Sequence, residues 1–313
     1  MPNTPRPAFS ITRRSALMGA AALPLAAATS SPAFAAAEMM GVAATRFNRV
    51  KLGDFEVTTL LSGTRTVPGP HGIFGLNASD EDFAAASKAA NIPDDKAQFF
   101  FTPTVVNTGS ELILFDTGLN PGLISGALQA AGYSTDQIDK VVLTHMHGDH
   151  IGGMADGGTA TFANASYITG ATEFDAWSKM ENEGFEAKVR PFAENMSMIK
   201  GGDSVASGIT AVEAFGHTPG HMAYMIESGG EQLMLAVDFA NHYVWSLAHP
   251  DWEVKFDQDK AKAAETRRKM LDMIAAEKMP FVGYHMPWPG IGYVEKAGDG
   301  YTYVPTSYQM MLD

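Results

Sequence analysis

Two kinds of hydrophobic pattern follow one another along the chain. Short apolar runs rich in β-branched residues predict buried strands, which we place at residues 55–63, 138–145, 165–170, 208–216 and 281–285. Longer runs with apolar residues at helical spacing predict helices at residues 80–91, 122–132 and 258–279. Asp257 is the predicted N-cap of the last helix, and Pro280 ends it.

Two further stretches have the pattern of β-hairpins. In residues 104–118 apolar runs flank an Asn-Thr-Gly-Ser turn, and in residues 223–238 they flank Gly229 and Gly230. Each hairpin lies in one half of the chain and is followed by a helix. This order predicts two stacked mixed β-sheets with helices on the outside, in a single domain over residues 37–313.

The first 36 residues have a different composition from the rest. An Arg-Arg pair precedes an apolar run from Ala16 to Ala28, and small residues flank Phe34 just before the end of this segment. These features predict a twin-arginine-type signal peptide over residues 1–36, and therefore a protein that is periplasmic or secreted. A membrane anchor is the alternative, but the apolar run is too short to span a bilayer comfortably.

Charge and cysteine content narrow the classes of partner. The chain carries a net charge of −13, and loss of Arg6, Arg13 and Arg14 with the signal leaves 19 basic against 35 acidic residues, a net charge of −16. Such a surface repels phosphate backbones and anionic lipid, so nucleic acid and membrane are poor candidate partners for the mature chain. Because the chain has no cysteine, any metal must be bound by His, Asp, Glu or backbone oxygen.

The sequence LTHMHGDHIGG, residues 143–153, places three histidines and an aspartate within six positions. A buried strand leads into His145, and because alternate residues of an extended chain share a face, His145 and His147 can bind one ion. If the chain then turns into a helix, Asp149 and His150 project from its first turn toward a second point. A solvated polar loop is the alternative, but this density of histidines beside an apolar strand favours a metal site.

Three more candidate ligands follow predicted strands elsewhere in the chain. His217 comes after the strand at residues 208–216, Asp238 ends the second hairpin, and His285 ends the last predicted strand. A fold that gathers these strand ends at one edge would bring them to His145 and complete a site.

These motifs resemble those of the metallo-β-lactamase fold superfamily. THMHGDH at 144–150, GHTPGH at 216–221, an Asp after an apolar strand and a last His after another strand occur in the family's order. The resemblance covers essentially the whole mature chain and implies an α/β fold, the αββα sandwich of two mixed β-sheets flanked by helices. The stretches VVNTGSELILFDTG and PGIGYVEKAGDGYTYVP resemble methyl parathion hydrolase-like secreted members of the superfamily.

The resemblance also implies a two-metal site whose ligands come from the motifs quoted above. The first ion would be bound by His145, His147 and His217, the second by Asp149, His150 and His285, and both would be bridged by Asp238 together with a hydroxide. Asp116 matches the family's aspartate that orients a ligand histidine, and His221 is expected to act as a structural hydrogen-bonding residue rather than as a ligand.

Two divalent ions are therefore the expected cofactors. Zinc is the default for a histidine-rich site, and manganese, cobalt or iron are the alternatives. A pair of such ions lowers the pKa of a shared water and polarises the bond under attack. This predicts a dinuclear metallo-hydrolase with Asp149 and Asp238 in catalytic roles, where Asp149 or a water passes a proton to the leaving group.

Aromatic residues close to the ligands in sequence are candidates for the walls of a substrate pocket. They are Phe101 at the end of a three-phenylalanine run, Tyr243, Trp245 and Trp288. An apolar pocket would favour a small, mostly apolar, ester-like substrate. The resemblance to methyl parathion hydrolase-like members implies that this substrate is an organophosphotriester, a lactone or an aryl ester.

Two departures from the family pattern bear on the substrate. Val237 stands where the family usually has glycine before the bridging aspartate, and Asn241 stands where quorum-quenching lactonases carry a carbonyl-polarising tyrosine. The second departure counts against a dedicated lactonase, which we keep as an alternative. We also keep open a non-catalytic metal- or partner-binding protein on the same fold and a one-iron oxidoreductase of the persulfide dioxygenase type. A homodimer is left open, since relatives of this kind often dimerise.

Overall fold

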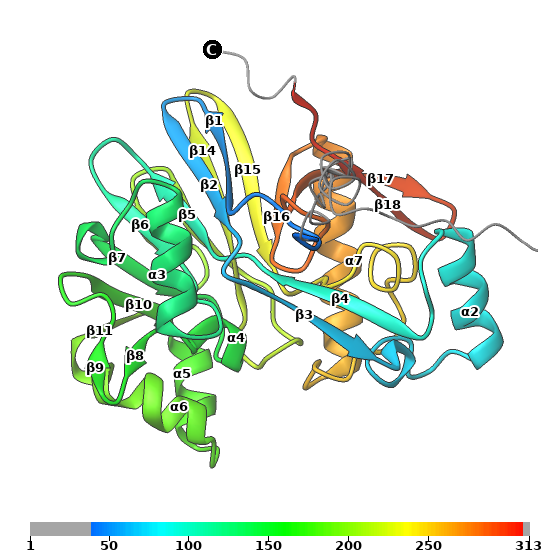
Figure 1. Cartoon of the computed structure of the whole chain (residues 1–313), viewed down its shortest axis with the longest axis horizontal. Helices are drawn as coiled ribbons and strands as arrows, with labels where there is room; N and C mark the ends of the chain where they lie inside the picture. The colour runs from blue at the N-terminus through cyan, green and yellow to red at the C-terminus, as the bar shows by residue number, and fades with distance from the viewer. Residues whose placement is uncertain (1–38, 309–313) are drawn as a thin grey trace, which may run out of the picture. The chain divides into compact units, whose positions relative to one another are not determined.

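Two seven-stranded mixed sheets form the centre of the computed structural model, which describes residues 39–308 (Figure 1). The first has the order β1 (Phe47–Leu52), β2 (Phe55–Leu60), β5 (Thr104–Asn107), β6 (Leu112–Phe115), β7 (Lys140–Leu143), β10 (Ser166–Gly170) and β11 (Met196–Ile199). The second has the order β12 (Ser204–Ala206), β13 (Ile209–Glu213), β14 (Met222–Ser228), β15 (Glu231–Val237), β16 (Phe281–Gly283), β17 (Ile291–Ala297) and β18 (Gly300–Pro305). Parallel pairing links β6, β7, β10 and β11 in the first sheet and β15 with β16 in the second.

The remaining elements are two short ribbons and the helices. The ribbons pair β3 (Gly63–Pro68) with β4 (Lys96–Phe101), and β8 (Ala155–Asp156) with β9 (Thr159–Ala160). The α-helices are α2 (Asp80–Ala89), α3 (Pro121–Ala130), α4 (Gly148–Ile151), α5 (Ala171–Ser178), α6 (Glu183–Lys188) and α7 (Lys260–Glu277). Short 3₁₀ turns occur at Pro70–Gly72, Thr135–Gln137 and Arg190–Asn195.

Three hydrophobic clusters define four layers, helix, sheet, sheet and helix. Side chains of both sheets, such as Val57 and Leu235, meet in the cluster between them. The outer face of the first sheet packs against α3, α5 and α6, for example through Leu128 and Trp177. The outer face of the second sheet packs against α7. This is the αββα sandwich expected from the sequence, which is confirmed.

Burial on both faces explains why the central strands are continuous apolar runs. In β6, Ile113 and Phe115 face the cluster between the sheets, whereas Leu114 faces the helices. Successive side chains of a strand point to opposite faces, so a strand covered on both sides needs apolar residues at every position. β7 is also apolar along its buried part, so the change to polar residues after Leu143 marks the end of this strand and the start of the histidine cluster.

The predicted hairpins are confirmed as β5–β6 and β14–β15, and the predicted helices as α2, α3 and α7. One boundary was wrong. The N-cap of α7 is Asp259, whose side chain accepts a hydrogen bond from the backbone N–H of Lys262 at 3.0 Å, and not Asp257. Asp257 is buried instead, for a reason that concerns the site below.

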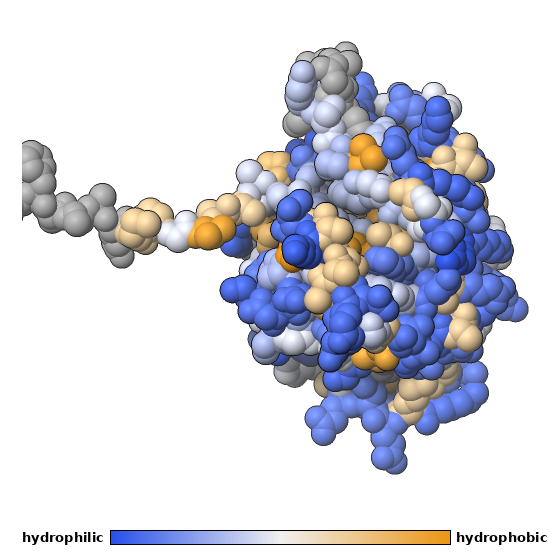
Figure 2. All heavy atoms as spheres, turned by 90° about the vertical axis from the view of Figure 1, so that its right-hand side faces the viewer, coloured by the Kyte–Doolittle hydropathy of each residue, from blue (hydrophilic) through white to orange (hydrophobic). Residues whose placement is uncertain are grey.

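The predicted signal peptide, residues 1–36, lies outside the described part of the chain. Among residues 39–308, no helix combines the length and the apolar character that crossing a membrane requires. On the face drawn in Figure 2, hydrophilic side chains predominate and hydrophobic ones are scattered between them.

Candidate metal centre

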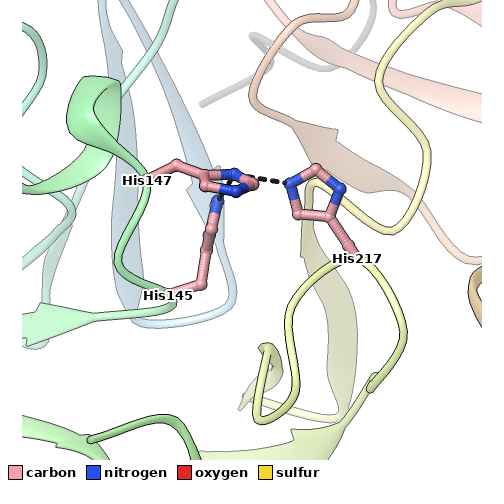
Figure 3. A group of neighbouring side chains, drawn as sticks. All are labelled: His145, His147 and His217. Atoms are coloured by element: carbon pink, nitrogen blue, oxygen red, sulfur yellow. Dashed lines mark hydrogen bonds between the residues drawn. The ribbon is translucent and has the colours of Figure 1, made fainter. Parts of the chain in front are cut away.

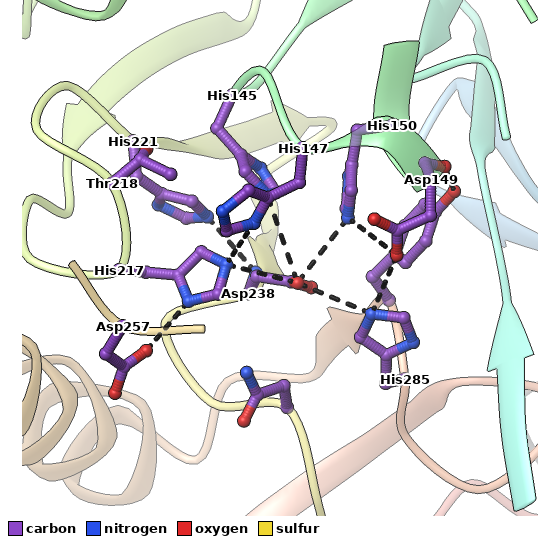
Figure 4. A network of polar contacts seen from close by, with 12 residues as sticks. His145, His147, Asp149, His150, His217, Thr218, His221, Asp238, Asp257 and His285 are labelled. Atoms are coloured by element: carbon purple, nitrogen blue, oxygen red, sulfur yellow. Dashed lines mark hydrogen bonds and ion pairs between the residues drawn. The ribbon is translucent and has the colours of Figure 1, made fainter. Parts of the chain in front are cut away.

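The seven predicted ligands meet at one edge of the two sheets, although they come from four parts of the chain. β7 ends two residues before His145, β15 ends directly before Asp238, and β16 ends two residues before His285. Figure 4 shows the imidazoles and carboxylates of the set pointing toward one another. The expectation that strand ends converge is therefore fulfilled by the topology.

Three imidazoles form the first group of donors (Figure 3). Nδ1 of His147 lies 3.1 Å from Nε2 of His145 and 3.0 Å from Nε2 of His217. Nitrogen atoms at such distances can share one ion, which replaces a proton between them. His145 and His147 lie on one extended segment, two residues apart, as the sequence spacing predicted.

The second group consists of Asp149, His150 and His285. Oδ2 of Asp149 lies 3.3 Å from Nε2 of His285 and 3.6 Å from Nε2 of His150. Asp149 and His150 belong to α4, so the predicted turn into a helix after His147 is present. The close approach of this helix to the preceding loop requires glycine, because a Cβ on Gly152 would lie 2.2 Å from the carbonyl oxygen of Leu119.

Asp238 lies between the two groups. Its Oδ2 atom is 3.5 Å from Nε2 of His217, on one side, and 3.4 Å from Nε2 of both His150 and His285, on the other. A single carboxylate oxygen thus lies close to imidazoles of both donor groups. This is the position that a bridging ligand has to occupy.

The backbone at the end of β15 turns Asp238 into the site. Val237 has a φ of 55°, in the left-handed region that β-branched residues rarely adopt, and the pairing of β15 with β16 shifts register at this point. His221 does not belong to either donor group. Its Nε2 accepts a hydrogen bond from the backbone N–H of Asp238 at 3.1 Å, so His221 helps to position Asp238 through its backbone.

Electrostatic effects within the site favour a bound cation. Burial lowers the pKa of His147 to about 3, which leaves a neutral imidazole able to act as a ligand. Burial alone would raise the pKa of Asp149, but His150 and His285 outweigh burial and lower it to about 2. Burial alone would lower the pKa of His285, but Asp238 and Asp149 outweigh it and raise the pKa to about 10. The buried carboxylates therefore require positive charge beside them, and divalent ions supply it.

The donor set fits a pair of divalent first-row ions. Nε2 of His150 and Oδ1 of Asp238 are buried and have no hydrogen-bond partner among residues 39–308. Buried polar atoms are normally paired, so free lone pairs beside other ligand atoms are suited to coordinate a cation. Imidazole nitrogens together with carboxylate oxygens are donors that zinc accepts.

Asp116 holds one ligand in place. Its Oδ2 accepts hydrogen bonds from Nδ1 of His150 and from the Thr144 hydroxyl, both at 2.8 Å, and its Oδ1 accepts from the Thr144 backbone N–H at 2.9 Å. This arrangement orients His150 so that Nε2 faces the site. It is the contact that the sequence implied for Asp116.

We expect Asp116→Asn to weaken zinc binding by about 10- to 100-fold, because an amide cannot accept all three hydrogen bonds and misorients His150. Competition against a chromophoric chelator measures the affinity. Asp139→Asn is the matched control, since Asp139 also accepts a strand N–H, from Leu112 at 2.7 Å, but is exposed and away from the ligands. Equal affinities for both variants would contradict this role of Asp116.

Two buried carboxylates, Asp257 and Glu173, support the candidate ligands and were not predicted from the sequence. Asp257 accepts a hydrogen bond from Nδ1 of His217 at 2.8 Å (Figure 4). Arg267 donates to the other oxygen of Asp257, also at 2.8 Å. Glu173 accepts from the Met146 and Gly220 backbone N–H groups and so ties the two histidine-bearing loops together. Nothing local in the sequence marks these residues, because their roles arise from contacts between distant segments.

A cavity of about 350 Å³ opens onto the metal centre. Its apolar walls are formed by Val67, Ile73, Phe99, Phe101, Leu119 and Phe256. The rings of Phe99 and Phe101 both pack edge-on against His285, with centroid distances of 5.5 Å. The predicted apolar pocket therefore exists, and Phe101 is part of it.

The other three aromatic candidates do not line this cavity. Trp245 is only 1% exposed and lies in a core cluster, where its indole N–H donates to Ser87 Oγ at 3.0 Å. The Trp288 indole N–H donates to Thr45 Oγ1 at 2.9 Å, and Tyr243 packs against the two core clusters beside it. Proximity to a ligand in sequence did not determine the direction in which these side chains point.

The αββα fold and the cluster of histidine and aspartate donors are typical of a class of metal-binding proteins. Comparison with known sequences identifies the family. The sequence pattern described as the metallo-beta-lactamase superfamily matches residues 102–276, more than half of the chain. The chain belongs to the metallo-β-lactamase superfamily.

Individual relatives agree with this assignment. The N-acyl homoserine lactonase AiiA of Bacillus thuringiensis subsp. kurstaki is 28% identical over 196 residues, which cover 54% of this chain and 74% of AiiA. The structure of AidC, a dizinc quorum-quenching lactonase, is 27% identical with a TM-score of 0.78, over 83% of this chain and 97% of AidC. The structure of the β-lactamase-superfamily hydrolase AbOPH is 26% identical with a TM-score of 0.78, over 85% and 99% of the two chains. Together with the donor set, these similarities confirm the predicted enzyme class, a dinuclear metallo-hydrolase.

Proposed function

We propose that this enzyme hydrolyses an ester bond in a small, mostly apolar molecule, with a lactone as the first candidate and two zinc ions as cofactors. The observation that carries the proposal is Asp238 Oδ2, which lies within 3.5 Å of three imidazoles of the donor set, in the lining of a cavity with apolar walls. Similarity to the lactonases AiiA and AidC favours a lactone over the other ester-like substrates.

The seven residues would hold the ions as the two groups around Asp238, with His145, His147 and His217 in one and Asp149, His150 and His285 in the other. When bound, the ions lower the pKa of water and polarise the bond under attack. Phe99, Phe101 and Leu119 exclude bulk water from the bond, which strengthens electrostatic interactions in the site.

Asp149 is the group best placed to move a proton. Its side chain is 24% exposed toward the cavity, whereas the His150 side chain behind it is fully buried. Because the pKa of Asp149 is lowered to about 2, its carboxylate is ionised at neutral pH. The ionised carboxylate can accept a hydrogen bond from the attacking water and so orient it, and Asp149 or a water then passes the proton to the leaving oxygen.

Asn241 replaces the tyrosine of the quorum-quenching lactonases without taking over its role. It is only 3% exposed, and its Oδ1 accepts a hydrogen bond from the Ser246 hydroxyl at 3.0 Å. It is not among the residues that line the cavity. In the proposed reaction, polarisation of the carbonyl would therefore come from the metal ions rather than from this side chain.

The test is a panel of lactones, aryl esters and phosphotriesters offered to zinc-, manganese- and cobalt-loaded protein. We expect the highest kcat/KM with a lactone, loss of activity by at least about a hundredfold after chelation, and recovery when metal is restored. Two bound ions without turnover of any of the three classes would favour a non-catalytic metal-binding protein. About one iron per chain in the isolated protein would favour an oxidoreductase of the persulfide dioxygenase type.

A further inference from the structure

Arg65 is a lining residue of the cavity whose charge the metal centre does not explain. It lies in the middle of β3, where the register pairs Gly63 with Phe101, Arg65 with Phe99, and Val67 with Ala97. Alternate residues of a strand share a face, so Arg65 is on the same face of the ribbon as the wall residues Phe99 and Phe101. Arg65, which is exposed, thus adds a cation to a face of the ribbon that is otherwise apolar.

The position of Arg65 relative to the metal centre follows from its cross-strand neighbour. Directly opposed side chains of an antiparallel pair lie about 5 Å apart at Cβ, and the ring of Phe99, opposite Arg65, packs against His285 with a centroid distance of 5.5 Å. Phe99 is therefore the neighbour of Arg65 across the ribbon and also the neighbour of the candidate ligand His285. A molecule whose scissile bond lies at the metal centre can reach Arg65 along this aromatic wall.

The guanidinium of Arg65 makes no ion pair and no hydrogen bond with any residue between 39 and 308. Arg267 and Arg268, in contrast, are both paired with aspartates. The chain has 35 acidic residues against 22 basic ones, so an arginine beside a cavity could easily have been neutralised. A planar guanidinium that is free of partners is suited to bind a carboxylate through two parallel hydrogen bonds.

We propose that Arg65 forms a subsite for a carboxylate at the far end of the acyl part of the substrate. The preferred substrates are then esters or lactones with an apolar acyl chain that ends in an anion. The chain would lie against Phe99 and Phe101, with its carbonyl carbon at the metal centre. This inference rests on the proposed ester hydrolysis, since it takes the scissile bond to lie beside Asp238.

The experiment compares 4-nitrophenyl hexanoate with the 4-nitrophenyl monoester of hexanedioic acid, which differ only in a terminal methyl or carboxylate. We expect Arg65→Met to raise the ratio of KM for the anionic ester to KM for the neutral ester about tenfold, because a charge-assisted hydrogen-bonded pair is lost. Arg65→Lys should keep part of the preference, and Arg65→Glu should reverse it. Lys96→Met is the matched control, because Lys96 lies on the same ribbon but is exposed on the opposite face.

The 4-nitrophenyl monoesters of dicarboxylic acids with four to eight carbons provide a second readout. Because the cation is fixed in the wall, we expect KM to be lowest at one chain length, and we expect this minimum to disappear in Arg65→Met. An unchanged KM ratio in Arg65→Met, or an equal change in Lys96→Met, would overturn the proposal. If wild-type protein hydrolyses neither ester, calorimetric binding of hexanedioate and hexanoate to the zinc-loaded protein decides instead. A preference for hexanedioate that is lost in Arg65→Met supports the subsite even if the proposed reaction is wrong, and its absence contradicts the subsite.

Discussion

Replacement of Asp238 by alanine is expected to lower kcat/KM for ester hydrolysis by about a thousandfold or more. Among residues 39–308, Asp238 offers the carboxylate that lies within 3.5 Å of imidazoles from both donor groups. Without it, the buried histidines lose the negative charge that lies between them, and both donor groups would lose a carboxylate oxygen that could bind their ions.

Steady-state kinetics and the zinc content of the purified variant measure this effect together. We expect zinc to fall from two ions per chain to one or fewer, because Asp238 would ligate both. Asp94→Ala is the control, since Asp94 is exposed and lies outside both the cavity and the donor set. An Asp238→Ala protein that keeps two zinc ions and full activity would show that the bridging role is wrong.

The convergence of the candidate donors could be predicted because its signals are local. His145, His147, Asp149 and His150 lie within one short motif, and His217 and His285 each follow an apolar run that ends at the site. A strand covered on both faces has to be apolar throughout, so the first polar residue after it marks the sheet edge. The αββα layers follow from the same alternation of buried strands and amphipathic helices.

Residues that act through distant partners could not be predicted in this way. Asp257 and Asp259 are both plausible helix caps in sequence, and only the contacts of Asp257 with His217 and Arg267 separate them. Trp245 is as close to Asp238 in sequence as a pocket residue would be, yet it packs beneath α2 against Phe83. Burial of such side chains depends on which segments the fold stacks on them, which no short window of sequence contains.

The ribbon of β3 and β4 was missed for a related reason. Its strands are separated by a long segment that contains α2, and their outer face is exposed and polar, as at Thr66 and Gln98. The Phe99–Phe101 run suggested aromatic walls but not the strand that opposes them. Arg65 therefore had no predicted place, although it lines the cavity that opens onto the donor set.

Arg267→Met is expected to destabilise the folded protein by about 3–5 kcal/mol. The guanidinium is fully buried and donates to the Phe239 and Pro250 carbonyl oxygens at 2.9 and 2.8 Å as well as to Asp257. Its removal leaves the buried Asp257 carboxylate without a counter-ion and two backbone carbonyls without hydrogen-bond donors. Leaving such buried groups unpaired is what destabilises the folded state. Because Asp257 also orients His217, zinc affinity should fall in the same variant.

Urea denaturation and chelator competition measure the two effects, with Arg268→Met as the matched control. Arg268 is the next residue of α7 and pairs with Asp251, but both side chains are substantially exposed, so its loss should cost no more than about 1 kcal/mol. In the double variant Asp257→Leu/Arg267→Met, neither position carries a buried charge. Part of the lost free energy of unfolding should therefore return, while zinc affinity stays low. Recovery of both properties together, or equal stability of the Arg267 and Arg268 variants, would contradict a link from Arg267 through Asp257 to the metal ligand His217.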